Sequence, residues 1–337
     1  MDVAVVGGGV IGLACAVELA DRGISVTVLE RGEPGAEASG AAAGILGPQS
    51  EAHAPGPMVD LCVRSFAMYP AWLQRLGAEA GFRACGTLHL AFTEAEGLAL
   101  EAMRDWQRAV GLRAELRNDA RASVALWLPD EGQVDNRLLV KALRRRAEVL
   151  GVAFLRAAAT AIEPGAVVHA GGAFHAGRVV LAAGCWSADL RPVPVFPVRG
   201  QLMIVDAPPP PSVVFGAGGY LVPREGRTLV GATVERAGFD KALTAEGLAE
   251  LSAVAAKLGV RGRVTERWAG LRPGSPDGLP FLGELNGAVV ATGHFRNGIL
   301  LAPVTADIVR ALVRGEPSPV PLAPFAPGRP LPEVRPR

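Results

Sequence analysis

A glycine-rich turn between two strand-like segments at the start of the chain constrains its fold more than any other feature. Residues 2–6 form a short apolar run, and residues 7–12 follow with glycine at the first, third and sixth places of G-x-G-x-x-G. Residues 10–22 have helical periodicity, and residues 24–29 alternate like a second strand that is followed by Glu30. A strand, tight turn, helix, strand and terminal acid in this order predict a βαβ unit that binds a dinucleotide.

Each of the three glycines has its own role in such a unit. Gly7 allows the tight turn, Gly9 lets the backbone approach a pyrophosphate, and Gly12 lets the helix pack closely on the strand. The start of the helix directs free N–H groups and the positive end of its dipole toward the phosphates. Glu30 is placed to accept hydrogen bonds from ribose hydroxyl groups. Outside this context, an acid at a strand end would be interpreted as a solvated side chain.

Charge and cysteine usage exclude several classes of protein. The 337 residues carry a formal net charge of +1, so no strong field attracts nucleic acid or an anionic membrane. The four cysteines form neither a C-x-x-C pair nor a zinc spacing with histidine, which predicts no metal site and free thiols in a reducing cytoplasm. We expect neither a signal peptide nor a membrane span, because the first residues lack a basic region and no apolar segment is long enough to cross a bilayer.

The order of the remaining segments predicts the fold class. After the βαβ start come mixed strands, many of them antiparallel, and the chain then returns to a strand, a loop and a helix. We predict an α/β fold in which a Rossmann-type domain is built from separated segments and a β-rich (α+β) substrate domain is inserted between them. The expected boundaries are 1–80, 140–200 and 265–315 for the Rossmann-type domain, 81–139 and 201–264 for the substrate domain, and 316–337 for a loose proline-rich tail.

Three later segments fit a flavin better than a nicotinamide. The tiny side chains of residues 38–46 let backbone N–H groups approach a bulky planar ring. Residues 181–184 end a buried strand with Ala-Ala-Gly, and residues 292–299 precede the last predicted helix. A helix start directed at the pyrimidine end of a flavin would stabilise the reduced anionic ring. The alternatives are a flexible surface loop for the first segment and an ordinary capped loop for the last.

Four segments together resemble the D-amino acid oxidase family of FAD-dependent oxidoreductases. They are residues 7–30, 38–47, 270–278 (GLRPGSPDG) and 293–303 (GHFRNGILLAP). The last segment is the most specific, and it is more similar to the glycine oxidase branch than to sarcosine or D-alanine oxidases. The resemblance covers the chain up to the proline-rich tail.

The resemblance implies non-covalently bound FAD, and no cysteine stands out as an attachment point. The residues expected at the cofactor are Gly7, Gly9, Gly12, Glu30, Arg31, Ser39, Ala42, Ala43, Gly44, Ala183, Gly184, Arg272, His294, Arg296, Asn297, Gly298 and Ile299.

The resemblance also indicates three residues for the substrate. Arg272 matches an arginine that pairs with the substrate carboxylate, and a planar guanidinium suits bidentate binding of that group. Tyr220 matches a tyrosine that hydrogen-bonds the same carboxylate, and Arg296 matches an arginine that lines the pocket. Each has a purely structural alternative, which is strongest for Arg296 as a brace of its loop. Ile45 and Val234 stand where glycine oxidases often have methionine, which keeps the pocket apolar and leaves its size limit open.

The implied reaction is FAD-dependent oxidative deamination of glycine and other small amines to the imine, then to glyoxylate and ammonia, with oxygen reduced to hydrogen peroxide. The imine also supplies thiazole synthesis for thiamine. No histidine or carboxylate general base is evident near the matched residues, and hydride transfer needs none once the amine is deprotonated. A cytoplasmic homo-oligomer, a tetramer by the resemblance, is expected.

Three alternatives stay open on the sequence. The nearest is a sarcosine or D-amino acid oxidase or dehydrogenase of the same family. A non-catalytic FAD-binding subunit would not need both Arg272 and Tyr220. An NAD-dependent dehydrogenase would leave residues 38–44 and 292–299 unexplained.

Overall fold

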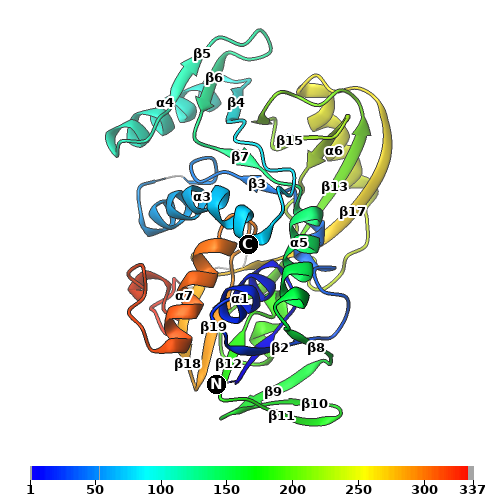
Figure 1. Ribbon diagram of the computed structural model, residues 1–337. Helices are drawn as coiled ribbons and strands as arrows, with labels where there is room; N and C mark the ends of the chain where they lie inside the picture. The colour runs from blue at the N-terminus through cyan, green and yellow to red at the C-terminus, as the bar shows by residue number, and fades with distance from the viewer. Residues whose placement is uncertain (1, 53, 333–337) are drawn as a thin grey trace.

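Strand β1 is buried on both faces in the computed structural model of the chain, which describes residues 2–52 and 54–332 (Figure 1). Val3 and Val5 pack against helices, whereas Ala4 and Val6 pack against a small sheet on the opposite side. Successive side chains of a strand point to opposite faces, so an uninterrupted apolar strand needs a cover on each face. This part of the molecule therefore has three layers: helices, a six-stranded sheet and a three-stranded sheet.

The six-stranded sheet is parallel except at one edge, where β18 runs antiparallel to β19. Its order is β18-β19-β12-β1-β2-β8, so the chain leaves β1 toward β2 on one side and returns as β12 on the other. Such a switch point opens a crevice at the carboxyl ends of the strands, where ligands bind in α/β sheets. The strands are β1 (Asp2–Val6), β2 (Ser25–Glu30), β8 (Ala153–Arg156), β12 (Arg178–Leu181), β18 (Phe281–Leu285) and β19 (Ala288–Thr292).

The two faces of the six-stranded sheet are covered by different kinds of element. Helices from four separate stretches of the chain pack on one face, and a three-stranded antiparallel sheet packs on the other. The helices are α1 (Val10–Ala20), α3 (Pro57–Leu76), α5 (Asn136–Val149) and α7 (Ala302–Arg314), and the strands are β9 (Ala159–Glu163), β10 (Ala166–His169) and β11 (Gly172–His175).

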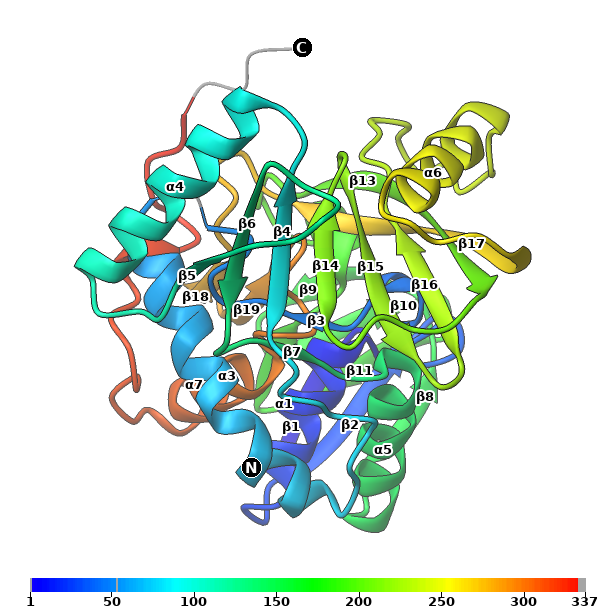
Figure 2. The ribbon, with the colours of Figure 1, turned by 90° about the horizontal axis from the view of Figure 1, so that it is seen from above.

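A second, eight-stranded sheet has a helix on one face. Leu221 of β15 packs in the cluster formed with helix α6, whereas the preceding residue, Tyr220, belongs to the cluster on the opposite face. Figure 2 shows β4, β6, β14, β15 and β16 side by side, with α4 and α6 beside them. Alternation along β15 therefore points Tyr220 away from α6. The further elements are β4 (Thr87–Ala91), α4 (Glu94–Ala109), β5 (Glu115–Arg117), β6 (Val124–Leu128), β14 (Val213–Gly216), β15 (Gly219–Arg224), β16 (Arg227–Gly231) and α6 (Ala245–Lys257).

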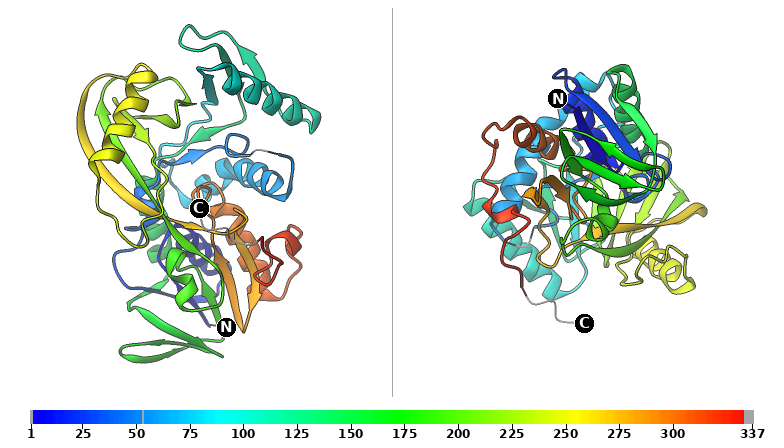
Figure 3. Two further views of the ribbon diagram at one scale, coloured as in Figure 1. Left: turned by 180° about the vertical axis from the view of Figure 1, so that it is seen from behind. Right: turned by 90° about the horizontal axis from the view of Figure 1, so that it is seen from below.

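Two long strands connect the two sheet regions. β13 (Phe196–Asp206) and β17 (Arg263–Gly274) pair antiparallel along their whole length, in a register that places Arg272 opposite Val198. Figure 3 shows this ribbon extending from the eight-stranded sheet toward the six-stranded one. Because β13 and β17 each run through a predicted boundary, the division of the chain into two domains stays a prediction. The remaining short elements are α2 (Ala38–Ala41), β3 (Ile45–Leu46), β7 (Gly132–Gln133), and the 3-10 turns η1 (Gly184–Asp189) and η2 (Ala323–Phe325).

The prediction of a loose tail from residue 316 is wrong for its described part, 316–332. Phe325 is buried in the core beneath the helices. Arg329 pairs with Asp277 at 2.7 Å and donates a hydrogen bond to the carbonyl oxygen of Leu279 at 2.9 Å. The high proline content suggested a loose segment. The anchoring contacts could not be predicted, because their partners lie far away in the sequence. Residues 333–337 lie outside the described residues.

Candidate functional site

A cavity of about 360 Å³ is lined by residues of both sheet regions. Its lining includes the turn after β1, the end of β12, one face of β13 and β15, and the segment before α7. Two expected cofactor residues, Gly12 and Asn297, do not line it. The expected residues that do are Gly7, Gly9, Glu30, Arg31, Ser39, Ala42, Ala43, Gly44, Ala183, Gly184, Tyr220, Arg272, His294, Arg296, Gly298 and Ile299.

The glycines of the first turn meet different neighbours. Gly7 has a φ of +106°, and a Cβ there would lie 2.5 Å from the carbonyl oxygen of Ala182. A Cβ on Gly12 would lie 1.9 Å from the carbonyl oxygen of Gly7. A Cβ on Gly9 would meet only Ser39 Oγ, at 3.3 Å. Gly7 and Gly12 therefore permit close backbone packing, and Gly9 keeps the start of α1 accessible from the cavity.

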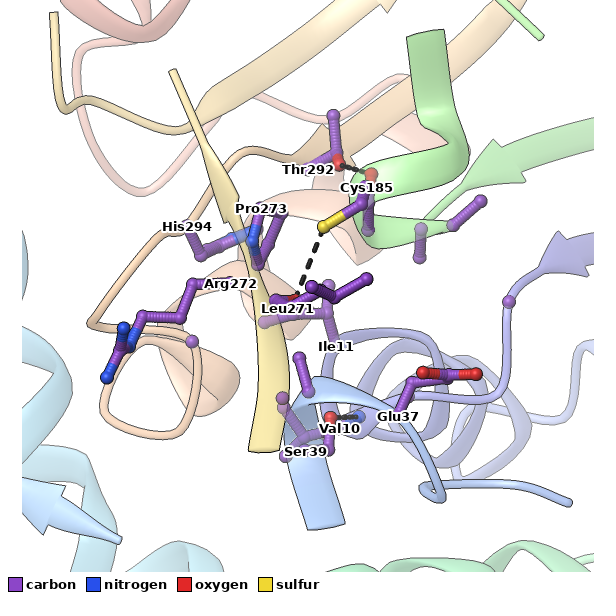
Figure 4. A pocket seen from close by; sticks show the side chains of 18 of the residues that line it. Val10, Ile11, Glu37, Ser39, Cys185, Leu271, Arg272, Pro273, Thr292 and His294 are labelled. Carbon is purple, nitrogen blue, oxygen red and sulfur yellow. Dashed lines mark hydrogen bonds between the residues drawn. The ribbon is translucent and has the colours of Figure 1, made fainter. Parts of the chain in front are cut away.

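Polar groups around this turn are held in place by hydrogen bonds. The Glu30 carboxylate accepts the backbone N–H groups of Gly8 and Gly32, each at 2.8 Å. Ser39 Oγ accepts the N–H of Val10 at 2.9 Å in the first turn of α1, as Figure 4 shows. A carboxylate has about four acceptor sites, so Glu30 keeps acceptor capacity for a ribose hydroxyl.

Next to Glu30 the cavity is bordered by charged, aromatic and sulfur-containing side chains. The guanidinium carbon of Arg31 lies 3.6 Å from the centre of the Trp186 ring, and Arg31 pairs with Glu37 at 3.3 Å. The thiol of Cys185 donates to the carbonyl oxygen of Leu271 at 3.3 Å. Burial raises the pKa of Cys185 to about 12, so the thiol stays protonated and is a poor nucleophile. This agrees with an unattached cofactor.

The segment before α7 presents backbone donors to the cavity. His294 Nε2 lies 3.1 Å from Thr305 Oγ1, and burial lowers the pKa of His294 to about 3, which keeps the ring neutral. Among the described residues, the N–H groups of Gly298 and Ile299 meet no acceptor. Two free donors just before a helix suit an electron-rich ring edge or an anion. Asn297 instead accepts a hydrogen bond from the N–H of Leu301 at 2.8 Å.

Arg272 extends from β17 into the cavity without a carboxylate partner in the described part of the chain (Figure 4). Its Nη1 donates to the carbonyl oxygen of Thr233 at 3.1 Å. Burial lowers the pKa of Arg272, yet an arginine begins far above neutrality and stays charged. A Cβ at Gly200 would lie 2.3 Å from Nη1 of Arg272, so this glycine makes room for the guanidinium. The Glu51 charge acts on Arg272 without forming an ion pair with it, and a secluded cation with no carboxylate bonded to it favours binding of an anionic ligand.

The side chain of Tyr220, which also lines the cavity, is a neutral phenol. Burial raises its pKa, although the positive charges of Arg272 and Arg296 act in the opposite direction. Its ring packs over Gly231, where a Cβ would lie 2.7 Å from the phenolic oxygen. Tyr220 therefore keeps a hydroxyl that can donate a hydrogen bond.

Arg296 is paired with a residue that was not among the candidates. Its Nε donates to the carboxylate of Glu51, and both side chains line the cavity. The sequence indicated no carboxylate general base near the substrate residues, and it gave no sign of this paired carboxylate. Glu51 follows a segment of small residues and belongs to no recognisable motif. Only the folded chain reveals its role, because it lies 245 positions from Arg296.

The two apolar positions differ in their placement. Ile45 lines the cavity, together with Leu202 of β13. Val234 is 58% exposed and does not line it. Val234 is thus a poor candidate for a limit on substrate size.

No cluster of histidine, cysteine, aspartate and glutamate in the described part of the chain could hold a metal ion. Among the described helices, none is both long and apolar enough to span a membrane.

Comparisons with known proteins extend over nearly the whole chain. Residues 2–312 match the family model DAO, FAD dependent oxidoreductase. A glycine oxidase of Geobacillus kaustophilus is 38% identical over 361 residues, which cover 96% of each chain. The crystal structure of glycine oxidase from that species matches with a TM-score of 0.93 at 36% identity, covering 98% of this chain and 99% of that one.

A second group of relatives is longer. The bifunctional protein ThiO/ThiG of Synechocystis is 41% identical over 345 residues, covering 93% of this chain and 51% of that protein. The chain thus spans about half the length of the bifunctional relatives that it matches.

Proposed function

The chain belongs to the DAO family of FAD-dependent oxidoreductases, and we propose that it oxidises glycine and other small amines in the cavity described above. The products are the imine, which hydrolyses to glyoxylate and ammonia, and hydrogen peroxide formed from oxygen. Relatives named glycine oxidase match along the full length of the chain and support this assignment. The observation that carries it is the cavity-lining guanidinium of Arg272, which has no carboxylate partner among the described residues.

The residues of the cavity fit FAD. The turn containing Gly7 and Gly9 would admit the pyrophosphate at the start of α1, and Glu30 would hold the ribose. The small residues 42–44 would lie against the flavin ring, and the free N–H groups of Gly298 and Ile299 would bind its polar edge. When bound, FAD accepts the hydride from the substrate α-carbon and passes the electrons to oxygen.

The remaining chemistry is binding and orientation by the protein. Arg272 and Tyr220 both present donors, so together they would fix the substrate carboxylate and thereby the direction of the α-carbon. The amine reacts in its neutral form and needs no base at the moment of oxidation. His294, with its pKa of about 3, is too weak a base for neutral pH. The Glu51 carboxylate is occupied by Arg296.

The cellular context is proposed from relatives and residues. The printed name ThiO/ThiG of the longer relatives supports delivery of the imine to thiazole synthesis for thiamine. The four free cysteines fit a reducing cytoplasm. We expect a homo-oligomer, a tetramer by family resemblance, and its mass in solution can be measured by light scattering.

Replacement of Arg272 tests the assignment. Arg272→Met should lower kcat/KM for glycine by on the order of tenfold or more, because charge-assisted bonds contribute about 1.5–3 kcal/mol. Oxidation of ethylamine, which lacks a carboxylate, should change much less, and FAD content should be unchanged. Arg267→Met alters an exposed arginine of the same strand and is the matched control. Equal glycine oxidation by Arg272→Met and the parent would refute the substrate assignment and leave the flavin assignment intact.

A further inference from the structure

We propose that Glu51 restricts the site to substrates with a single carboxylate by occupying the guanidinium of Arg296. The inference rests on the proposed function, because it concerns which amines that site accepts. Four polar side chains of the cavity lining, Arg272, Tyr220, Arg296 and Glu51, are close enough to influence one another electrostatically. Arg272 has no carboxylate partner among the described residues, whereas Arg296 is bonded to Glu51.

Formal charges give the selectivity its physical basis. Arg272 and Arg296 contribute two positive charges, Glu51 contributes one negative charge, and Tyr220 is neutral, so the group sums to +1. One substrate carboxylate bound at Arg272 neutralises this net charge of +1. A second carboxylate would find Arg296 occupied and would leave a net negative charge in a secluded place, which is strongly unfavourable without a partner.

The position of Glu51 is fixed by its neighbours in the chain. The Glu131 carboxylate accepts the N–H of Gln49 at 2.6 Å, the N–H of Ser50 at 2.7 Å, and the Ser50 hydroxyl group. Glu131 is fully buried, and burial raises its pKa.

A histidine also contacts this segment. His89 Nε2 lies 2.9 Å from Ser50 Oγ, and its ring stacks on Phe215 at 4.8 Å between centres. The backbone before Glu51 is therefore anchored at two consecutive residues. A second substrate carboxylate would have to compete with an anchored anion rather than displace a mobile loop.

Four proteins, with three different charges in the cavity, test the inference. The parent has +1, Glu51→Gln has +2, Arg296→Met has 0, and the double variant returns to +1 through Arg272 alone. Glu33→Gln is the control for total charge, because Glu33 is an exposed acid that pairs with Arg144 outside the cavity. Each protein is purified with FAD, and its FAD content is measured first.

The first readout is the binding of carboxylates that are not oxidised. This binding is monitored through changes in the flavin absorption spectrum. Glycolate carries one carboxylate, whereas malonate and succinate carry two at different spacings. Glu51→Gln should raise the affinity for at least one dicarboxylate, relative to glycolate, by about tenfold or more, as one new charge-assisted pair permits. Arg296→Met should bind glycolate more weakly than the parent does. The double variant should regain glycolate binding without gaining the dicarboxylate.

The second readout is turnover of iminodiacetate, an amine with two carboxylates, relative to glycine. This ratio of kcat/KM should rise in Glu51→Gln and return to the parent value in the double variant. In the control Glu33→Gln it should equal the parent value throughout. A ratio in Glu51→Gln within about twofold of the parent, for binding and for turnover, would overturn the inference. A gain that persists in the double variant would overturn it as well, because Arg296 would then not be the group released.

The two proposals fail in different ways. If the parent binds these carboxylates in the stated pattern but oxidises neither glycine nor other small amines, the proposed function is wrong and the charge selection stands. If glycine is oxidised but the four proteins do not differ in carboxylate binding as stated, only the inference about Glu51 is wrong. Should Glu51→Gln lose FAD, Arg296→Met still decides, because it keeps Glu51 and the inference requires its glycolate affinity to fall below that of the parent.

Discussion

Glu30 is the side chain proposed to hold the ribose of FAD. Its carboxylate holds two backbone N–H groups, of Gly8 and Gly32, and keeps acceptor capacity for the ribose. Glu30→Ala should weaken FAD binding by about tenfold or more, because hydrogen bonds to a charged group contribute about 1.5–3 kcal/mol. Turnover of the fully loaded enzyme should change little.

Titration of the FAD-free protein with FAD measures this effect through quenching of flavin fluorescence. Glu33→Ala is the matched control, since Glu33 lies in the same segment and pairs with Arg144 at the surface. An unchanged FAD affinity in Glu30→Ala would place the ribose elsewhere.

Residue identity alone was informative where the chemistry is local. Arg272 and Tyr220 were recognisable because each lies in a short motif with a suitable functional group, and both line the cavity. Glu51 was not recognisable, because its significance comes from pairing with Arg296 across 245 positions. Val234 was placed near the substrate by resemblance, although its side chain is exposed.

At the scale of elements, the pairing of β13 with β17 positions Arg272, the proposed ligand of the substrate carboxylate. Gly200 in β13 leaves room for the Arg272 guanidinium, and a Cβ there would lie 2.3 Å from both Nη1 and Nη2. Gly200→Ala should displace the guanidinium and raise KM for glycine by on the order of tenfold. Steady-state kinetics measure this, with unchanged FAD content as the check on folding.

Gly328→Ala is the control for this substitution, because a Cβ at Gly328 would meet nothing within 4 Å. If Gly200→Ala matched Gly328→Ala in its KM for glycine, the guanidinium would not need its observed position.

The elements predicted best were those with a strong internal pattern. The predicted βαβ start is β1, α1 and β2. Strand β17 was not predicted, because its glycines and proline obscure the alternation and its pairing with β13 supplies the hydrogen bonds. Strand β6 was missed for a similar reason: its partners, β4 and β5, lie elsewhere in the chain.

At the scale of the whole molecule, the cavity forms where separate stretches of the chain meet. Its lining comes from the first turn, from β13 and β15, and from the segment before α7. The sequence predicted an α/β fold with an inserted β-rich region, because patterns of apolar residues report burial within each element. It did not predict how Phe325 and Arg329 anchor the C-terminal segment, because burial of single residues by distant partners leaves no local pattern.

The absorption spectrum of the purified protein, recorded without oxygen before and after addition of glycine, tests the central claim most directly. The account predicts a yellow protein whose flavin absorption bands bleach on addition of glycine. Readmission of air should restore the bands and produce hydrogen peroxide, and denaturation should release free FAD. A colourless protein, or a flavin spectrum that neither glycine nor any other small amine bleaches, would contradict the account.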